Sequence, residues 1–351
     1  MKLTMRSPFG VYLLILMLGS LAVARPPENS YHLLKKYPFE AAPGSSTEYF
    51  DYITVDSAAR RVYLSRGTAV QVMDADTGAI IGNIGGFKRQ HGVALANEFA
   101  RGFISDGTQA NVTIFDLKTL AVIGTAKSDP DTDCVVYDPA SKRVFTMNGD
   151  SHNSTVIDAK SGTIVKTIDL GGSPEFAVAD GKGTVYASIA SKDEIAAIDS
   201  STLMVKSRWP VMPAGNPTAL AIDSQHRRLF SAGRKPQMLV VMDADSGKVI
   251  QSFPIGVAVD AAAYDADSGL VFASTRDGMV HVFHEDSPDK FSAVETIKTE
   301  FGAKTMGLDT KTHSLFLDTA DFGPAPAPTT ARPNPQPTAV LGTFRVLVYA
   351  R

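Results

Sequence analysis

The chain has one cysteine, Cys134, and one tryptophan among its 351 residues. A single cysteine excludes an intrachain disulfide and a zinc site built mainly from thiolates. The sequence also lacks Cys-x-x-Cys-His, so no covalent c-type haem is expected. Neither Gly-x-Ser-x-Gly nor Gly-x-x-x-x-Gly-Lys occurs, which removes the hydrolase nucleophile elbow and the phosphate-binding loop from consideration.

Long hydrophobic runs are scarce too, and the one candidate lies at the N-terminus. Lys2 and Arg6 precede an apolar run from Val11 to Leu21, and Ala22-Val23-Ala24 follows. This order is typical of a secretory signal peptide, and the run is shorter than the ~20 residues of a membrane-spanning helix. We therefore predict a signal peptide over 1–24, with cleavage after Ala24 rather than an uncleaved anchor. The mature chain, 25–351, is then periplasmic or secreted, without a membrane span or a lipobox cysteine.

An excess of positive charge is absent as well. Without the signal peptide the chain carries 32 Lys and Arg against 37 Asp and Glu, a net charge near −5. That balance gives no general attraction to nucleic acid. The sequence also offers no stripe of aromatic and basic residues on which bases could stack, so nucleic acid is not an expected partner.

What the sequence does contain is one unit repeated seven times. An apolar strand ends in an acidic or amide residue, a turn follows, and a second strand ends near Ser. The first-turn residues are separated by 41, 41, 42, 43, 42 and 44 positions; they are Asp56, Asn97, Asp138, Asp180, Asp223, Asp265 and Asp309. A third strand ends in turns such as Asp74-Ala75-Asp76-Thr77-Gly78. Asp and Gly favour such tight turns, and the short strands are rich in Val, Ile, Phe and Tyr.

Four short strands per ~42 residues predict an all-β, seven-bladed β-propeller with four-stranded antiparallel blades. The last copy supplies only three strands, around 304–308, 315–317 and 344–349. Residues 32–39 resemble a fourth strand, so the N-terminal strand is predicted to complete the C-terminal blade and close the ring. Residues 322–341 form a proline-rich loop in that blade, either a plain solvated loop or a docking segment. Residues 25–351 are thus expected to form a single domain.

The second strands carry a recurring tetrapeptide, seen as Val62-Tyr63-Leu64-Ser65, Gly102-Phe103-Ile104-Ser105, Val144-Phe145-Thr146-Met147, Val185-Tyr186-Ala187-Ser188, Leu229-Phe230-Ser231-Ala232 and Val271-Phe272-Ala273-Ser274. With these units the mature chain resembles the YVTN/YncE-like propeller family. The resemblance implies an exported binding protein; single-stranded DNA binding is attributed to one member. The same architecture also hosts lactonases and redox enzymes, so the resemblance is more specific for fold than for function.

Up-and-down blades place all entries to the first strands at one end of the channel. The position five residues before each repeat Asp is Asp51, Gly92, Asp133, Glu175, Thr218, Asp260 and Lys304, with His91 beside Gly92. We call Asp51, His91, Asp133, Glu175, Asp260 and Lys304 the mouth ring. Loops on the same face add secondary candidates, which are Asp106, Asn148, Asp150 and His152.

Carboxylates that face one another raise each other's pKa unless a cation lies between them. The mouth ring therefore predicts either a ligand or metal site, or a wet channel lined by polar residues whose charges Lys304 and nearby arginines balance. In the first case the chain binds a small molecule or a partner protein as a monomer.

The alternative is an enzyme that resembles the propeller lactonases or lyases. One divalent metal ion on Glu175, Asp260 and Asp133 would polarise a lactone carbonyl, with His91 or His152 as the general base. Of the two functions, a non-enzymatic binding protein is the first expectation, and no catalytic residue is assigned.

Overall fold

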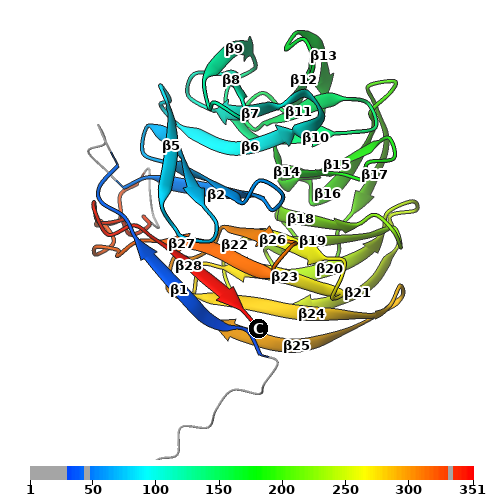
Figure 1. Cartoon of the computed structure of the whole chain (residues 1–351). Helices are drawn as coiled ribbons and strands as arrows, with labels where there is room; N and C mark the ends of the chain where they lie inside the picture. The colour runs from blue at the N-terminus through cyan, green and yellow to red at the C-terminus, as the bar shows by residue number, and fades with distance from the viewer. Residues whose placement is uncertain (1–29, 43–47, 331–334) are drawn as a thin grey trace, which may run out of the picture.

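The structure is a computed structural model that describes residues 30–42, 48–330 and 335–351. The predicted signal peptide and its cleavage site lie outside the described residues. Seven four-stranded antiparallel sheets are arranged as blades around a central channel (Figure 1). The predicted seven-bladed β-propeller is confirmed.

Blades 1 to 6 each use four consecutive strands, with the first strand innermost. The strands of blades 1 to 3 are β2 (Phe50–Asp56), β3 (Arg61–Arg66), β4 (Ala69–Asp74), β5 (Ile80–Gly85), β6 (Gln90–Ala96), β7 (Arg101–Asp106), β8 (Asn111–Asp116), β9 (Val122–Lys127), β10 (Thr132–Asp138), β11 (Arg143–Asn148), β12 (Asn153–Asp158) and β13 (Ile164–Asp169).

The strands of blades 4 to 6 are β14 (Pro174–Ala179), β15 (Thr184–Ile189), β16 (Glu194–Asp199), β17 (Met204–Pro210), β18 (Pro217–Asp223), β19 (Arg228–Arg234), β20 (Gln237–Asp243), β21 (Val249–Pro254), β22 (Val259–Asp265), β23 (Leu270–Thr275), β24 (Met279–Ser287) and β25 (Lys290–Lys298). Two single-turn 3-10 helices, η1 (Asn97–Phe99) and η2 (Ala190–Lys192), replace turns.

Blade 7 joins the two ends of the chain. Its sheet order is β1-β28-β27-β26, from β1 (His32–Pro38), β26 (Met306–Asp309), β27 (Ser314–Thr319) and β28 (Arg345–Ala350). The pairing of β1 with β28 confirms that the N-terminal strand completes the last blade. The innermost strand β26 in turn packs against β2 of blade 1, which closes the ring.

Each blade buries one aromatic side chain from the second position of the recurring tetrapeptide. These side chains are almost completely inaccessible to solvent; they are Tyr63, Phe103, Phe145, Tyr186, Phe230, Phe272 and Phe316. Burial of such a side chain stabilises a fold by about 1.5–3 kcal/mol. The tetrapeptide is therefore first of all the core of the blade.

The repeat Asp turns also connect neighbouring blades. In three blades, the residue four positions after the repeat Asp has a left-handed backbone conformation. Its side chain contacts the repeat Asp of the preceding blade. Arg60 pairs with Asp309 at 2.5 Å, and Arg227 pairs with Asp180 at 2.7 Å. His313 lies 2.8 Å from Asp265 in the same way. The turn face, opposite the mouth, thus carries ion pairs between blades.

The base of the proline-rich loop is ordered by a bridge between Phe322 and Ala339. Phe322 packs edge to face on Phe301, with ring centroids 5.3 Å apart.

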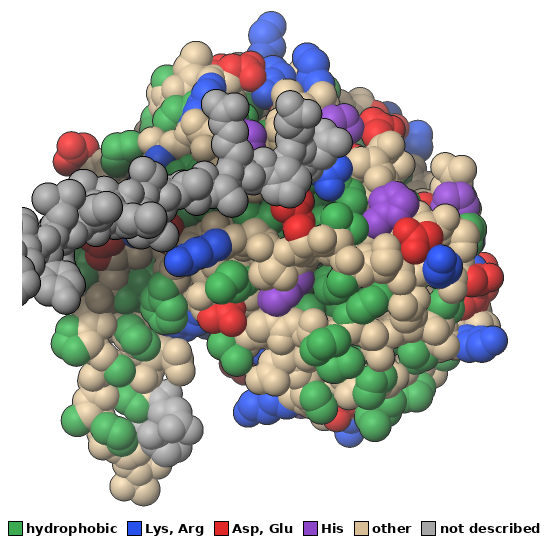
Figure 2. All heavy atoms as spheres, turned by 90° about the horizontal axis from the view of Figure 1, so that it is seen from below, with side chains coloured by type: hydrophobic (Ala, Val, Ile, Leu, Met, Phe, Trp, Pro, Cys, Tyr) green, Lys and Arg blue, Asp and Glu red, His purple; other side chains and the backbone are tan. Residues whose placement is uncertain are grey.

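On the face shown in Figure 2, Lys and Arg side chains lie among Asp and Glu and do not form a continuous basic surface. Among the described residues, no helix has the length and apolar character needed to cross a membrane.

Candidate functional site at the channel mouth

A β-bulge directs the mouth residues toward the channel. In β2, β6, β10, β14, β18 and β22 the pairing register shifts at the same point, near the start of the strand. The shifts fall at Asp51, His91, Asp133, Glu175, Thr218 and Asp260. An extra residue on one strand bends it and re-aims its side chains. In blades 1 to 6, the position that defines the mouth ring in sequence is thus also a structural irregularity of the strand.

Three mouth residues accept hydrogen bonds from tetrapeptide serines of the preceding blade. The hydroxyls of Ser65, Ser105 and Ser274 donate to the backbone carbonyls of His91, Asp133 and Lys304, respectively. Because each donor is buried, the bond links two blades in a place that water does not reach. The last residue of the motif therefore positions the backbone of the next blade's mouth residue.

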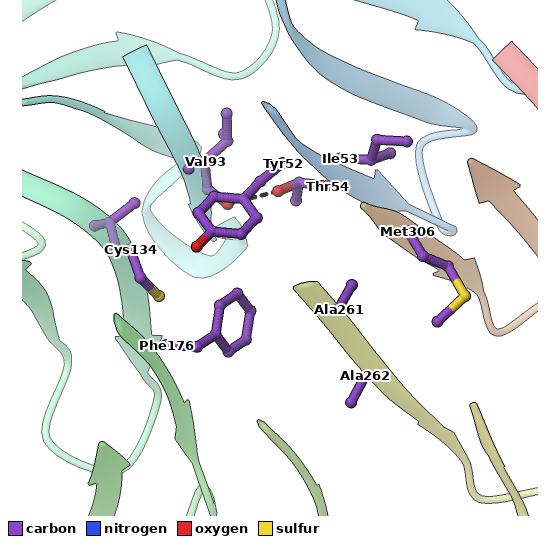
Figure 3. Close-up of a pocket in the computed structure, with 11 residues that line it drawn as sticks. Tyr52, Ile53, Thr54, Val93, Cys134, Phe176, Ala261, Ala262 and Met306 are labelled. Carbon is purple, nitrogen blue, oxygen red and sulfur yellow. Dashed lines mark hydrogen bonds between the residues drawn. The ribbon is translucent and has the colours of Figure 1, made fainter. Parts of the chain in front are cut away.

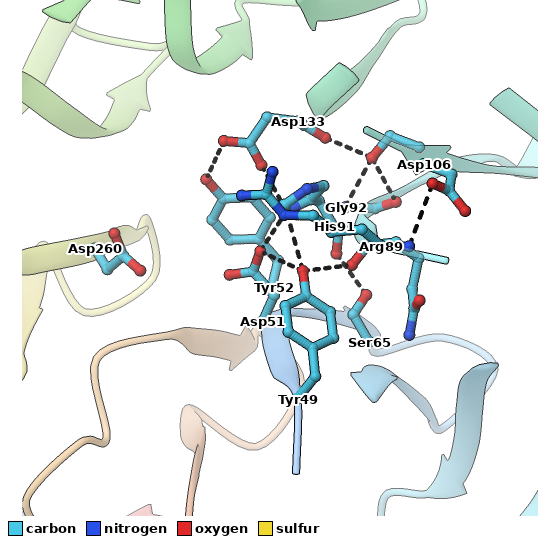
Figure 4. A network of polar contacts seen from close by, with 12 residues as sticks. Tyr49, Asp51, Tyr52, Ser65, Arg89, His91, Gly92, Asp106, Asp133 and Asp260 are labelled. Carbon is cyan, nitrogen blue, oxygen red and sulfur yellow. Dashed lines mark hydrogen bonds and ion pairs between the residues drawn. The ribbon is translucent and has the colours of Figure 1, made fainter. Parts of the chain in front are cut away.

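Blades 1 to 3 contribute a cluster of one histidine and two carboxylates, Asp51, His91 and Asp133, here named the histidine cluster (Figure 4). His91 Nδ1 lies 2.6 Å from Asp51 Oδ2 and 3.1 Å from Asp133 Oδ1. The Tyr49 hydroxyl lies 3.2 Å from the same nitrogen, and the Tyr52 hydroxyl donates to Asp133 at 3.4 Å. The His91 side chain is only 5% exposed.

The three groups of the histidine cluster differ in how readily they ionise. Burial opposes ionisation of Asp51, but the hydrogen bond with His91 and the charge of Lys304 hold its pKa below the ordinary value. Burial also opposes the charge on His91, but Asp51 and Asp133 raise its pKa. Burial raises the pKa of Asp133 to about 8, an effect that the charge of Asp51 increases and His91 opposes. The charged forms of Asp51 and His91 are thus favoured, whereas the protonated form of Asp133 is favoured.

Blades 5 to 7 contribute a second cluster, Asp260, Lys304 and Arg234, here named the lysine cluster. Asp260 accepts hydrogen bonds from both the Lys304 ammonium and the Arg234 guanidinium. Its side chain is 7% exposed, whereas those of Lys304 and Arg234 are 27% and 31% exposed. Burial opposes the charge on Lys304, but Asp260 and Asp51 raise its pKa. This side of the mouth therefore presents excess positive charge.

Glu175 lies between the two clusters along the ring. Within the described parts of the chain, no hydrogen bond or ion pair involves its side chain. Burial raises its pKa; Arg234 and Lys304 oppose this effect, while Asp260 adds to it. Glu175 is consequently a carboxyl group that a bound cation or hydrogen-bond donor could engage.

The secondary loop candidates divide into supporting and exposed residues. Asp106 is buried and accepts four backbone amide hydrogens, including that of Lys88 at 2.7 Å. Asn148 is buried too, and bonds to Thr132, Thr146, Asn153 and Thr155. Both are occupied in shaping loops. Asp150 and His152 are exposed, and no hydrogen bond links them to the mouth ring.

Below the mouth the channel becomes apolar and narrow. Tyr52 and Phe176 meet edge to face, with ring centroids 5.4 Å apart. They line a cavity of about 70 Å³ together with Cys134, Ala261, Ala262 and Met306 (Figure 3). Cys134 is buried, which raises the pKa of its thiol and agrees with a core position. A polar ligand would accordingly be held above this pair of rings.

Sequence reasoning missed Tyr49, Tyr52 and Asp318. Asp318 is fully buried on β27, where Thr305 donates to it at 2.5 Å; burial raises its pKa to about 8. A signal for it existed, because Leu315-Phe316-Leu317-Asp318 places Asp where four other tetrapeptides have Ser. Three of those serines, Ser65, Ser105 and Ser274, donate hydrogen bonds to the next blade, and a carboxyl group can donate one only when protonated.

Candidate metal ligands gather in three places within the described residues. The sets whose ligand atoms lie within 4.8 Å of one another are Asp51, His91 and Asp133; Asp223, His226 and Glu285; and Asp265, Asp267 and His313. Asp133 thus meets Asp51 and His91 instead of the expected Glu175 and Asp260. Asp260 is already neutralised by two cations, which makes it a poor metal ligand.

Comparison with known proteins supports the fold alone. No protein-family model matches the sequence. No curated protein matches it either. Among solved structures, a chain of hydrazine synthase from Kuenenia stuttgartiensis matches with a TM-score of 0.68 and 14% identity, over 79% of this chain and 95% of that one. A chain of the mitotic checkpoint complex matches with a TM-score of 0.70 and 11% identity, over 98% and 99%. Membership of the YVTN/YncE-like family stays a prediction.

Proposed function

We propose that this propeller is an exported, non-enzymatic binding protein that recognises a small polar ligand at its channel mouth. The observation that carries the proposal is the separation of charge around one opening. Asp133 of the histidine cluster and Glu175 offer carboxyl groups with raised pKa values on one side. The lysine cluster offers two partly exposed cations on the other.

A ligand with both a cationic and an anionic group fits this arrangement best. Its cationic group would replace the proton on Asp133 and lie near Glu175, while its anionic group would meet Lys304 and Arg234. Asp260 lies apart from Asp51 and Asp133 in Figure 4, so one ligand would connect two sides that have no direct bond. The predicted signal peptide supports a location of this function in the periplasm or outside the cell.

A thermal-shift screen with three groups of probes tests the proposal. Zwitterions such as amino acids and betaine should raise the melting temperature more than putrescine, which is only cationic, or succinate, which is only anionic. For any probe that binds, Asp133→Asn and Arg234→Ala should each weaken affinity by about 10-fold or more. Asp150→Asn, on an exposed loop of the same face, should leave it unchanged. A zwitterion affinity insensitive to both mouth substitutions would refute the proposal.

A metal-dependent, lactonase-like enzyme is the second candidate. It is favoured by the position of His91 between two carboxylates, since Asp51, His91 and Asp133 together offer one nitrogen and two oxygens. Such an ion would polarise a lactone carbonyl. Elemental analysis of the purified protein, with a screen of divalent ions and lactones, separates the two candidates. Bound metal together with lactone hydrolysis that Asp133→Asn abolishes would favour the enzyme.

A further inference from the structure

The junction between blades 5 and 6, on the turn face, differs from the junctions that carry ion pairs. Where Arg60, Arg227 and His313 reach back to the preceding blade, blade 6 has Gly269. Asp223 of blade 5 therefore receives no cation from the next blade. Blade 6 places a second carboxylate, Glu285 of β24, in that position.

Two buried carboxylates and one histidine meet at this junction. His226 Nδ1 lies 2.7 Å from Asp223 Oδ2 and 3.0 Å from Glu285 Oε1. Both carboxylate side chains are only 3% exposed, whereas the His226 side chain is 39% exposed. The cluster is thus buried on its acidic side and open to solvent beside the imidazole.

Glu285 has one oxygen without a hydrogen-bond partner. Oε1 is buried and receives no hydrogen bond, although it points at His226. A ring nitrogen carries at most one proton, so His226 Nδ1 cannot satisfy both carboxylates at once. An unpaired buried oxygen costs free energy, and here it lies beside a second negative group. Burial raises the pKa of Glu285 and Asp223 raises it further, whereas the hydrogen bond from Tyr264 and the contact with His226 lower it.

The other oxygen of each carboxylate is held by a separate donor. The Tyr264 hydroxyl donates to Glu285 Oε2 at 2.7 Å, and the Gln225 amide donates to Asp223 Oδ1 at 2.8 Å. The His226 amide also reaches Asp223 Oδ2, at 3.1 Å. Such outer contacts are the kind that orient metal ligands in proteins.

We propose that Asp223, His226 and Glu285 form a site for one divalent cation of the Zn²⁺ class on the turn face, distinct from the channel mouth. One imidazole nitrogen with two carboxylate oxygens is a donor set that Zn²⁺ accepts. Tetrahedral ligands around zinc are about 3.4 Å apart, so each carboxylate oxygen needs to move away from His226 Nδ1 by less than about 1 Å. Water would complete the coordination on the open side, beside His226.

The cation would take the structural place that arginine takes at other junctions. It would neutralise Asp223 and Glu285 and join blade 5 to blade 6, as Arg227 joins blade 5 to blade 4. The inference does not rest on the function proposed for the mouth, because no mouth-ring residue belongs to this cluster.

Zinc titration of the mature chain, after treatment with EDTA and dialysis, tests the site. We expect one Zn²⁺ to bind by calorimetry and to raise the melting temperature, with Co²⁺ giving visible absorption of a site that contains nitrogen. Glu285→Gln and His226→Ala should each weaken Zn²⁺ binding at least 10-fold. His313→Ala is the matched control, since its histidine also pairs with a repeat Asp but Asp267 beside it is exposed. This control should stay within twofold of the unchanged protein.

Two results would overturn the site. One is zinc affinity that survives both Glu285→Gln and His226→Ala, which would place the ion elsewhere, for example at the histidine cluster. The other is no zinc binding by the unsubstituted chain at neutral pH, which would leave Asp223, His226 and Glu285 as a cluster that holds no ion. If Glu285→Gln fails to fold, the result with His226→Ala decides, since that side chain is partly exposed.

Discussion

The two sides of the channel mouth start from the same position in the repeat and reach different electrostatic states. Asp133 and Asp260 both lie at the bulge of an innermost strand. Asp260 meets Lys304 and Arg234, while Asp133 shares one histidine with Asp51. Only Asp260 is balanced by two cations. The repeat thus sets where a side chain points, and the neighbouring blades set its charge.

The largest effect should come from removing β1, because it supports the blade that carries Lys304. A chain that starts after Glu40 loses the contacts of Tyr31 and Phe39 and exposes the edge of β28. We expect a loss of stability of roughly 4 kcal/mol or more, measured by urea unfolding. Amides of β26 should lose hydrogen-exchange protection before those of β6 and β10. A chain that starts at Arg25 is the control, and equal stability of the two would contradict ring closure by β1.

Replacing Lys304 should make the charge balance on the two sides of the mouth more alike. Lys304→Met leaves Asp260 with Arg234 alone and withdraws a charge that favours ionised Asp51. Because Lys304 is partly exposed, the cost should be about 2 kcal/mol, less than for a fully buried ion pair. Lys304→Arg should recover most of it. Equal urea midpoints for Lys304→Met and the parent chain would show that the lysine does not balance this side.

The pH dependence of stability compares one carboxyl group from each side, the half-buried Asp133 and the fully buried Asp318. Both pKa values are raised to about 8, above those of the unfolded chain, so the fold retains protons that the unfolded chain releases. Their contribution is fully present below about pH 4 and is lost as pH rises through about 8, by at most about 1.4 kcal/mol per pH unit for each group. Asp133→Asn and Asp318→Asn should each flatten the fall of melting temperature between pH 6 and pH 9. Unchanged slopes would mean that neither group is protonated at neutral pH.

The smallest expected effect concerns the serines beneath the mouth. Ser65 donates to the carbonyl of His91, whereas the buried hydroxyl of Ser188 has no partner. Ser65→Ala should cost about 1 kcal/mol in chemical unfolding, and Ser188→Ala close to none. Equal costs would show that the bond between blades 1 and 2 does not stabilise the mouth.

Much of the fold could be predicted from the sequence, since its signals are local and repeated. Turns such as Asp74 to Thr77 build their hairpins with their own side chains, as Asp74 Oδ1 accepts the Thr77 amide and hydroxyl at 2.8 Å each. The last copy lacks a fourth strand, and residues 32–39 form a strand that belongs to no other copy. Together these two features predicted that the N-terminal strand pairs with the last blade. The mouth ring could be predicted as a set of positions for the same reason.

What the sequence by itself determined, therefore, is the number of blades, the closure of the ring and the residues that surround its mouth. Only the tertiary structure decided that Asp133 meets His91 and Asp51, that Lys304 and Arg234 neutralise Asp260, and that Glu285 shares the His226 nitrogen with Asp223. Apart from the contact of His226 with Asp223, each of these pairings joins different blades, from residues at least 26 positions apart. A repeat period gives the radial position of a side chain, but bulge geometry, side-chain length and burial determine which neighbour it contacts.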